Sequence, residues 1–80
     1  EHESRLQKRN AREDLEKRLA GLTPRERDVL GMLMEGVATK IVARELNLSH
    51  RTVEGYRARI LEKTQVGSLT ELVNLHRLAG

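Results

Sequence analysis

Cysteine, phenylalanine and tryptophan are absent from this sequence of 80 residues, and Tyr56 is its only aromatic residue. The absence of cysteine excludes disulfide bonds and thiolate metal sites, and it suits the reducing environment of the cytoplasm. The shortage of aromatic side chains argues against a protein that binds single-stranded nucleic acid by stacking bases on aromatic rings. Any hydrophobic core must be aliphatic, and recognition of a double helix is still open.

Long apolar runs are missing as well. No stretch approaches the roughly 18 residues of a membrane span, and no signal-peptide pattern opens the sequence, so we expect no membrane partner. Fifteen Lys and Arg residues against twelve Asp and Glu residues give a net charge of +3. This balance permits a polyanionic partner without establishing one. The length predicts a single domain.

The sequence contains no cluster of residues typical of a catalytic or metal-binding site. Its three histidines, His2, His50 and His76, are isolated from one another, and no two lie four positions apart. The six glycines are scattered rather than gathered into a phosphate-binding loop. We therefore expect no enzymatic activity, no cofactor and no metal site.

Residues 1–20 are highly polar and lack proline and glycine, which predicts a solvent-exposed helix. Residues of opposite charge four positions apart, Glu13 with Lys17 and Asp14 with Arg18, would stabilise it weakly. An interdomain linker is the favoured interpretation. A short coiled coil between two chains is the alternative, although the leucines are too irregularly spaced to sustain a heptad repeat.

Four further helices are predicted from capping signals and apolar spacing, so the expected fold class is all-α. Capping boxes are predicted at Thr23 with Glu26 and at Ser68 with Glu71. No segment alternates with the two-residue period of a strand. The expected helices run from Thr23 to Gly36, from Lys40 to Leu46 with Thr39 as the cap, from Ser49 to about Lys63, and from Ser68 onward.

A corner of only three residues, Asn47 to Ser49, separates the second and third of these helices. Together with the small Ala43 before the corner and the branched Val53 after it, this spacing is typical of a helix-turn-helix. Helical hairpins without DNA-binding activity share such spacings, so the pattern alone leaves both possibilities open. Between residues 39 and 63 the sequence has six basic and three acidic residues, which favours contact with a polyanion.

The outer face of the helix that follows the corner has no large hydrophobic residue. Gly55 and Ala58 leave the middle of this face nearly bare, so that a helix could approach base edges closely. Arginines flank the bare strip. For His50, at the start of this helix, a plain surface role is favoured over contact with DNA. The outward positions on a helical wheel are Arg51, Glu54, Gly55, Ala58, Arg59 and Glu62.

The segments "LTPRE", "KIVA", "SHRTVE" and "SLTELV" occur here in an order that resembles the DNA-binding domain of LuxR-type regulators, and in particular the FixJ and NarL response-regulator branch. The resemblance covers about residues 20–78. It implies a compact four-helix helix-turn-helix domain at residues 21–80, preceded by a polar linker helix at residues 1–20 that belongs to a missing receiver-like domain.

The function that the resemblance implies is sequence-specific binding of double-stranded promoter DNA by a bacterial two-component transcriptional regulator. The third helix of the domain would enter the major groove, and the fourth would pair two copies on DNA. The implied partners are promoter DNA, a second copy of the chain, RNA polymerase and the receiver domain, in the cytoplasm at the bacterial nucleoid. A sigma-factor region-four-like domain and a helical protein-interaction module are the alternatives.

The resemblance also implies roles for individual residues. Glu54 has two open interpretations, because it could accept a hydrogen bond from a cytosine amino group or merely screen nearby arginines. Thr64 occupies a position where Leu or Met is common, so we expect looser packing there. The implied base contacts are Glu54, Gly55, Ala58 and Arg59; the implied backbone contacts are Thr39, Lys40, Arg51, Thr52, Tyr56 and Arg57; the implied dimer contacts are Leu69, Leu72 and Val73.

Overall fold

The computed structural model describes residues 2–80, with side chains described from residue 5 onward. Within these residues the chain forms helices joined by short turns and has no strand, which confirms the predicted all-α class. The helices are α1 (His2–Leu19), α2 (Pro24–Met34), α3 (Thr39–Glu45), α4 (His50–Thr64) and α5 (Leu69–Ala79).

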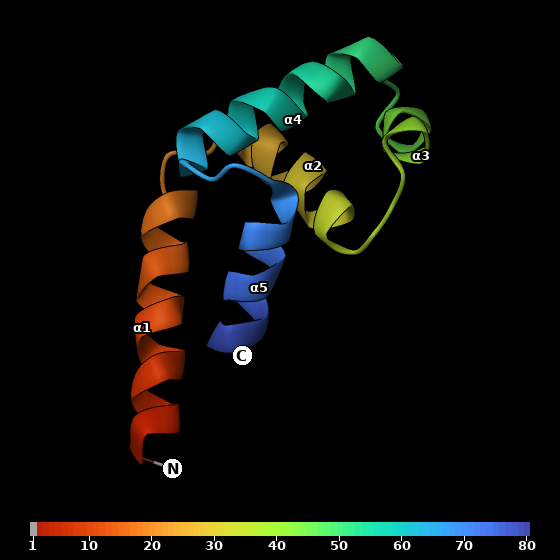
Figure 1. Cartoon of the computed structure of the whole chain (residues 1–80). Helices are drawn as coiled ribbons and strands as arrows, with labels where there is room; N and C mark the ends of the chain where they lie inside the picture. The colour runs from red at the N-terminus through yellow and green to blue at the C-terminus, as the bar shows by residue number, and fades with distance from the viewer. Residues whose placement is uncertain (1) are drawn as a thin grey trace.

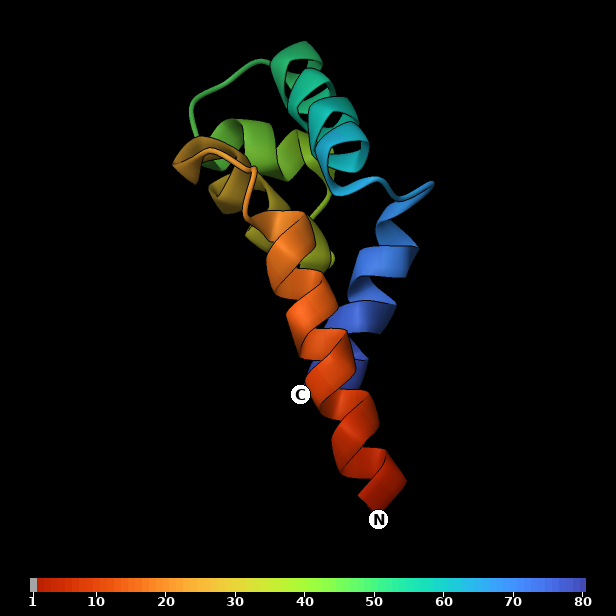
Figure 2. The same cartoon turned by 90° about the vertical axis from the view of Figure 1, so that its left-hand side faces the viewer.

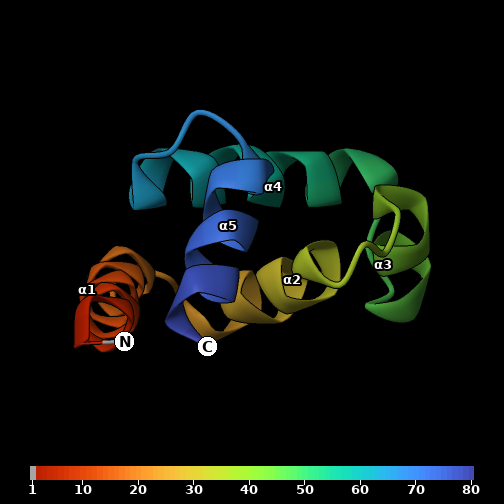
Figure 3. The same ribbon diagram turned by 60° about the horizontal axis from the view of Figure 1, so that its bottom comes forward.

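Helix α4 lies across the upper edge of the molecule in Figure 1, with the other described helices on its lower side. Helices α1 and α5 run side by side beneath its C-terminal half, and α3 packs beneath its N-terminal end (Figures 1 and 2). Helix α2 runs below α4 between these two groups, as Figure 3 shows with the bottom of the molecule turned forward. One long face of α4 is therefore free of the other described helices.

The hydrophobic core lies where the five helices meet, and it is aliphatic throughout, as the sequence predicts. Burying each such side chain contributes about 1.5–3 kcal/mol relative to leaving it in water. Val29, Leu30 and Leu33 form an apolar face of α2 toward this core. The buried core residues are Leu15, Leu22, Val29, Leu30, Leu33, Val42, Ala43, Val53, Ile60 and Leu72.

Both predicted capping boxes are present. Thr23 Oγ1 accepts a hydrogen bond from the Glu26 N–H at 3.1 Å, and Glu26 Oε1 accepts one from the Thr23 N–H at 2.9 Å. At α5 the Ser68 N–H donates to Glu71 Oε2 at 3.1 Å. These reciprocal bonds satisfy backbone donors that the first turn of a helix leaves unpaired, which fixes where α2 and α5 begin.

The prediction that Thr39 caps α3 is wrong. The N-cap is Ala38, whose side chain makes no capping hydrogen bond, and Thr39 is the first helical residue. The threonine hydroxyl lies instead 2.9 Å from His50 Nε2 on α4. The sequence favoured Thr39 because threonine is a better N-cap than alanine, but sequence places a helix end only to within one or two residues.

The expectation of a fully solvent-exposed first helix is wrong for one of its faces. Ala11 and Leu15 of α1 are buried, and α1 packs along α5 (Figure 1). Arg18 Nη1 donates to the carbonyl of Thr64 at 2.6 Å, and also to that of Gln65 at 3.2 Å. A cationic side chain at the C-terminal end of a helix satisfies carbonyls that have no partner within the helix, so Arg18 ties α1 to the end of α4.

Of the two charge pairs predicted on α1, one is confirmed and one is wrong. Arg18 Nε lies 3.1 Å from Asp14 Oδ1. Glu13 instead pairs backward along the helix, with its Oε2 3.6 Å from Arg9 Nε. Both arrangements join residues four positions apart, so helical spacing permits either partner for Glu13.

Thr64, expected to pack loosely, is fully buried at the C-terminal end of α4. Its hydroxyl donates to the carbonyl of Ile60 at 2.6 Å, one turn earlier in the same helix. This bond satisfies the hydroxyl group and allows a polar residue to occupy a core position. The next residue, Gln65, adopts the left-handed conformation (φ 60°) and ends the helix.

Candidate DNA-binding site

The turn between α3 and α4 sets the direction in which α4 leaves the core. Asn47 adopts the left-handed conformation with φ 57°, and the Leu48 N–H donates to the carbonyl of Ala43 at 2.8 Å. Ser49 then caps α4, its Oγ accepting from the Thr52 N–H at 3.0 Å. Ala43 and Val53 are both buried where the two helices cross. The predicted helix-turn-helix geometry is therefore present.

The outer face of α4 matches the predicted arrangement. Arg51, Glu54, Ala58 and Glu62 are exposed, and Gly55 is half-buried beside them. We call this surface, from Arg51 to Glu62, the exposed strip of α4. No large hydrophobic side chain belongs to it, so its composition is unlike that of a typical protein-interface core.

The structure gives no packing reason for glycine at position 55. A Cβ atom added there would meet only Arg59 Nη1, at 3.7 Å, which is an ordinary van der Waals distance. Glycine within a helix costs about 0.5–1 kcal/mol relative to alanine. The absent side chain therefore lowers the stability of the helix and leaves the backbone accessible in the middle of the strip.

Arg59, predicted as a base contact, lies on the flank of the strip and is directed toward α2. Its Nε is 3.8 Å from Glu26 Oε2, and its guanidinium carbon is 4.8 Å from the ring centroid of Tyr56. Lys63 Nζ lies closer to the same carboxylate, 2.9 Å from Glu26 Oε1. The side chain of Arg59 remains more than half exposed, so the contact with Glu26 leaves it accessible from solvent.

Glu26 is a structural residue of this site that the sequence identified only as part of a capping box. Its side chain is 3% exposed, and the hydrogen bond from the Thr23 backbone, followed by that from Lys63, lowers the pKa of its carboxyl group below the ordinary value. Burial acts in the opposite direction but does not prevail. Glu26 is therefore ionised at neutral pH and holds the C-terminal half of α4 against the start of α2.

The N-terminal end of the strip is linked to α3 through a histidine. His50 Nε2 lies 2.9 Å from Thr39 Oγ1 on α3 and 3.5 Å from Glu54 Oε2 one turn along α4. The sequence had favoured a plain surface role for His50. The imidazole is exposed, but it contacts one predicted backbone-contact residue and one predicted base-contact residue.

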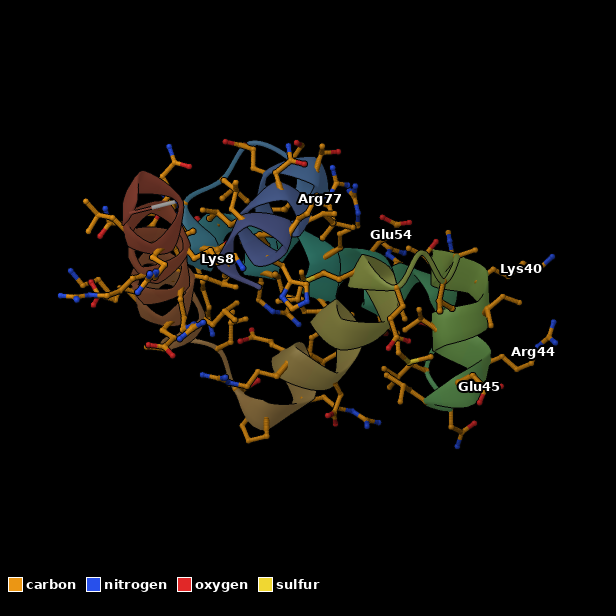
Figure 4. The ribbon with its side chains drawn as sticks, turned by 90° about the horizontal axis from the view of Figure 1, so that it is seen from below. Lys8, Lys40, Arg44, Glu45, Glu54 and Arg77 are labelled. Atoms are coloured by element: carbon orange, nitrogen blue, oxygen red, sulfur yellow. The ribbon has the colours of Figure 1, made fainter. Side chains whose placement is uncertain are left out.

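The remaining predicted backbone contacts lie around the strip rather than on it. Lys40 is exposed on α3 and extends away from the rest of the molecule (Figure 4). Thr52 is exposed, and its hydroxyl accepts a hydrogen bond from the Ser49 hydroxyl at 2.8 Å. Tyr56 and Arg57 are half-buried on the inner side of α4. Lys40 and the exposed strip are therefore both accessible from solvent, whereas Tyr56 and Arg57 are accessible over only part of their surface.

One of the three predicted dimer contacts requires correction. Leu72 is 0% exposed within a single chain, so it has no surface to offer a second copy. The pattern of apolar residues on α5 could not separate core from interface, because both require an apolar side chain. Leu69 and Val73 are half-buried on α5, and their part in dimerisation remains a prediction.

Residues 20–76 match the model of the family described as "Bacterial regulatory proteins, luxR family". The chain belongs to this family. It is 49% identical over 71 residues to the transcriptional regulatory protein FixJ of Azorhizobium caulinodans, covering 89% of this chain and 34% of that protein. It is 47% identical over 68 residues to FixJ of Bradyrhizobium diazoefficiens, covering 85% of this chain and 33% of that protein.

The crystal structure of full-length FixJ from B. japonicum superposes on this chain with a TM-score of 0.80 and 44% sequence identity. The match covers 91% of this chain and 36% of the FixJ chain. This luxR-family chain thus spans about a third of the length of the curated relatives it matches.

The family consists of DNA-binding regulators of transcription and not generally of enzymes, and its helix-turn-helix serves DNA binding. In the described residues, no helix is long and apolar enough to span a membrane.

Proposed function

We propose that this chain binds double-stranded promoter DNA sequence-specifically as the effector domain of a bacterial two-component transcriptional regulator, with α4 in the major groove. The observation that carries the proposal is the exposed strip of α4. Gly55 and Ala58 give its middle little side-chain bulk, and the cation Arg51 lies at one end. A major groove about 12 Å wide admits one α-helix, and a helix without bulky outer side chains can sit deep in it.

Within this arrangement the contacts divide into two groups. Glu54, Gly55, Ala58 and Arg59 face the bases, where the methyl group of Ala58 suits the methyl group of thymine. The second group binds the sugar–phosphate backbone and fixes the position of the domain without sequence preference. Its members are Thr39, Lys40, Arg51, Thr52, Tyr56 and Arg57.

The proposed assembly on DNA contains two copies of the chain. Two copies would bind neighbouring half-sites about one helical turn apart, pairing through Leu69 and Val73 on α5. A receiver domain would precede α1 in the full-length protein, and RNA polymerase would be contacted at the promoter. The site of action is the nucleoid in the bacterial cytoplasm. The presence of α5 after the turn at residues 65–68 argues against a sigma-factor region-four-like domain, whose pattern ends at its recognition helix.

Ala58→Glu tests the docking face directly. The substitution places a bulky carboxylate in the middle of the strip, so we expect binding to a duplex selected by the wild-type protein to be lost in a gel-shift titration. Ala20→Glu is the matched control, because it adds the same charge at an exposed alanine after α1 and should leave binding unchanged. Binding of Ala58→Glu at wild-type affinity would refute the proposed docking face.

Arg51→Ala separates backbone contacts from base contacts. Loss of a phosphate contact should weaken binding to all duplexes alike, and it should reduce the slope of log affinity against log salt concentration by about 0.9. Arg5→Ala, at an exposed position on α1, should change neither quantity. A salt slope near zero for the wild-type protein would instead favour a protein-interaction module.

A further inference from the structure

His50 connects the two helices of the helix-turn-helix on the side where α4 begins. Its Nε2 atom lies 2.9 Å from Thr39 Oγ1 and 3.5 Å from Glu54 Oε2, and the imidazole and the carboxylate are both about half exposed. The Thr39 hydroxyl is within hydrogen-bond distance of Nε2, and the tautomer of the ring decides which of the two donates. The Glu54 carboxylate lies within ion-pair distance of the same nitrogen. Nε2 of His50 therefore lies between a side chain of α3 and the carboxylate of Glu54.

Glu54 needs such a partner because of where it lies. It is the one acidic residue between positions 46 and 61, a segment that also contains Arg51, Arg57 and Arg59. Near DNA, an unrestrained glutamate would rotate away from the phosphates, with which it shares its sign of charge. A side chain held in a single orientation keeps its carboxylate in place without losing rotamer entropy when DNA binds.

We propose that His50, fixed by Thr39, is a positioning residue that orients Glu54 and thereby determines the base preferred opposite the N-terminal part of α4. The base class this arrangement suits is cytosine, whose amino group in the major groove donates a hydrogen bond that a carboxylate accepts. This inference rests on the proposed function, because it assumes that α4 lies in the major groove. Glu54 then acts in base recognition, and His50 acts through it.

The test is selection of bound sites from a pool of random duplexes, carried out in parallel with wild-type protein and the variants Glu54→Ala, His50→Ala and His50→Gln. Glutamine keeps an N–H donor in its side chain, whereas alanine has none. We expect Glu54→Ala to lose the preference for a C·G pair at one position of each half-site. His50→Ala should weaken the same preference about two- to fivefold, the range expected for one exposed ion pair. His50→Gln should retain most of it.

The possible outcomes distinguish a failure of the proposed function from a failure of the positioning role of His50. If the wild-type protein enriches no sequence, the proposed function fails, and this inference fails with it. If the wild-type protein enriches a site but His50→Ala keeps the full preference that Glu54→Ala loses, only the positioning role is overturned. It is also overturned if Glu54→Ala keeps every preference, or if His50→Ala weakens all sequences equally, because a uniform loss identifies His50 as a backbone contact. Thermal unfolding of each variant confirms that the fold is retained.

Discussion

Replacing Gly55 with alanine should make the domain more stable and a poorer DNA-binding protein. Glycine in the interior of a helix is about 0.5–1 kcal/mol less favourable than alanine, and the new methyl group would meet nothing nearer than Arg59 Nη1 at 3.7 Å. For a domain of this size, each 1 kcal/mol raises the melting temperature by about 4–8 °C. We therefore expect a rise of a few degrees in thermal denaturation followed by circular dichroism.

The same methyl group lies in the middle of the exposed strip of α4. If the backbone at Gly55 touches the floor of the major groove, forcing an extra methyl group into that contact costs about 1–3 kcal/mol. Because each 1.4 kcal/mol is tenfold in affinity, DNA binding should fall by about 5- to 140-fold. Fluorescence anisotropy with a duplex selected by the wild-type protein measures this loss.

Gly31→Ala is the matched control for Gly55→Ala. Gly31 lies within α2, is exposed, and has no heavy atom within 4 Å of the position a Cβ would take. It should give a similar rise in melting temperature with no change in DNA affinity. Unchanged affinity in Gly55→Ala would refute the placement of the strip against DNA. A lower melting temperature would refute the argument that glycine has no structural role at this position.

Two predictions concern the contacts that position α4. Arg18→Ala removes charged hydrogen bonds to the carbonyls at the end of α4, so the free energy of unfolding should fall by about 1–3 kcal/mol in urea denaturation. Lys17→Ala, at an exposed neighbouring position, should leave it unchanged, and equal effects of the two substitutions would contradict the role of Arg18. Because the folded state lowers the pKa of Glu26, this carboxylate stabilises the fold above the ordinary value of 4.5, and the stabilisation is lost as the pH falls through the lowered value. The difference in unfolding free energy between wild-type protein and Glu26→Gln should therefore be largest near pH 7 and shrink at pH 3; a difference independent of pH would show that ionisation of Glu26 contributes nothing.

Local features of this fold could be predicted from the sequence because neighbouring residues determine them. The capping bonds of Thr23 and Ser68 involve residues only three positions away, and the left-handed conformation at Asn47 follows from the tight corner. The exposed strip followed from helical periodicity alone, since it requires only that Val53 face inward. The family resemblance then supplied the expected role of each helix and of individual residues on DNA.

Contacts between distant parts of the chain could not be predicted in this way. Lys63 reaches the Glu26 carboxylate across 37 positions, and no periodicity relates the two residues. The position of Leu72 depends on which helices surround α5, because an amphipathic pattern is the same for a core face and for an interface. The cap of α3 was misplaced by one residue because the local sequence favours threonine over alanine as an N-cap, whereas the Thr39 hydroxyl lies against His50, 11 positions away.

Helix α1 shows most clearly what a composition-based interpretation omits. Its charge pattern is that of a solvated linker, yet a linker that crosses a folded surface still buries whichever small and aliphatic side chains face that surface. Ala11 and Leu15 are buried in this way, and Arg18 completes the attachment at the end of α4. Helix α1 and the helix-turn-helix are therefore not mechanically independent. Arg18 belongs to α1 and donates hydrogen bonds to the carbonyls at the end of α4. A displacement of α1 along α5 must therefore either break these hydrogen bonds or move α4, the helix that carries the exposed strip.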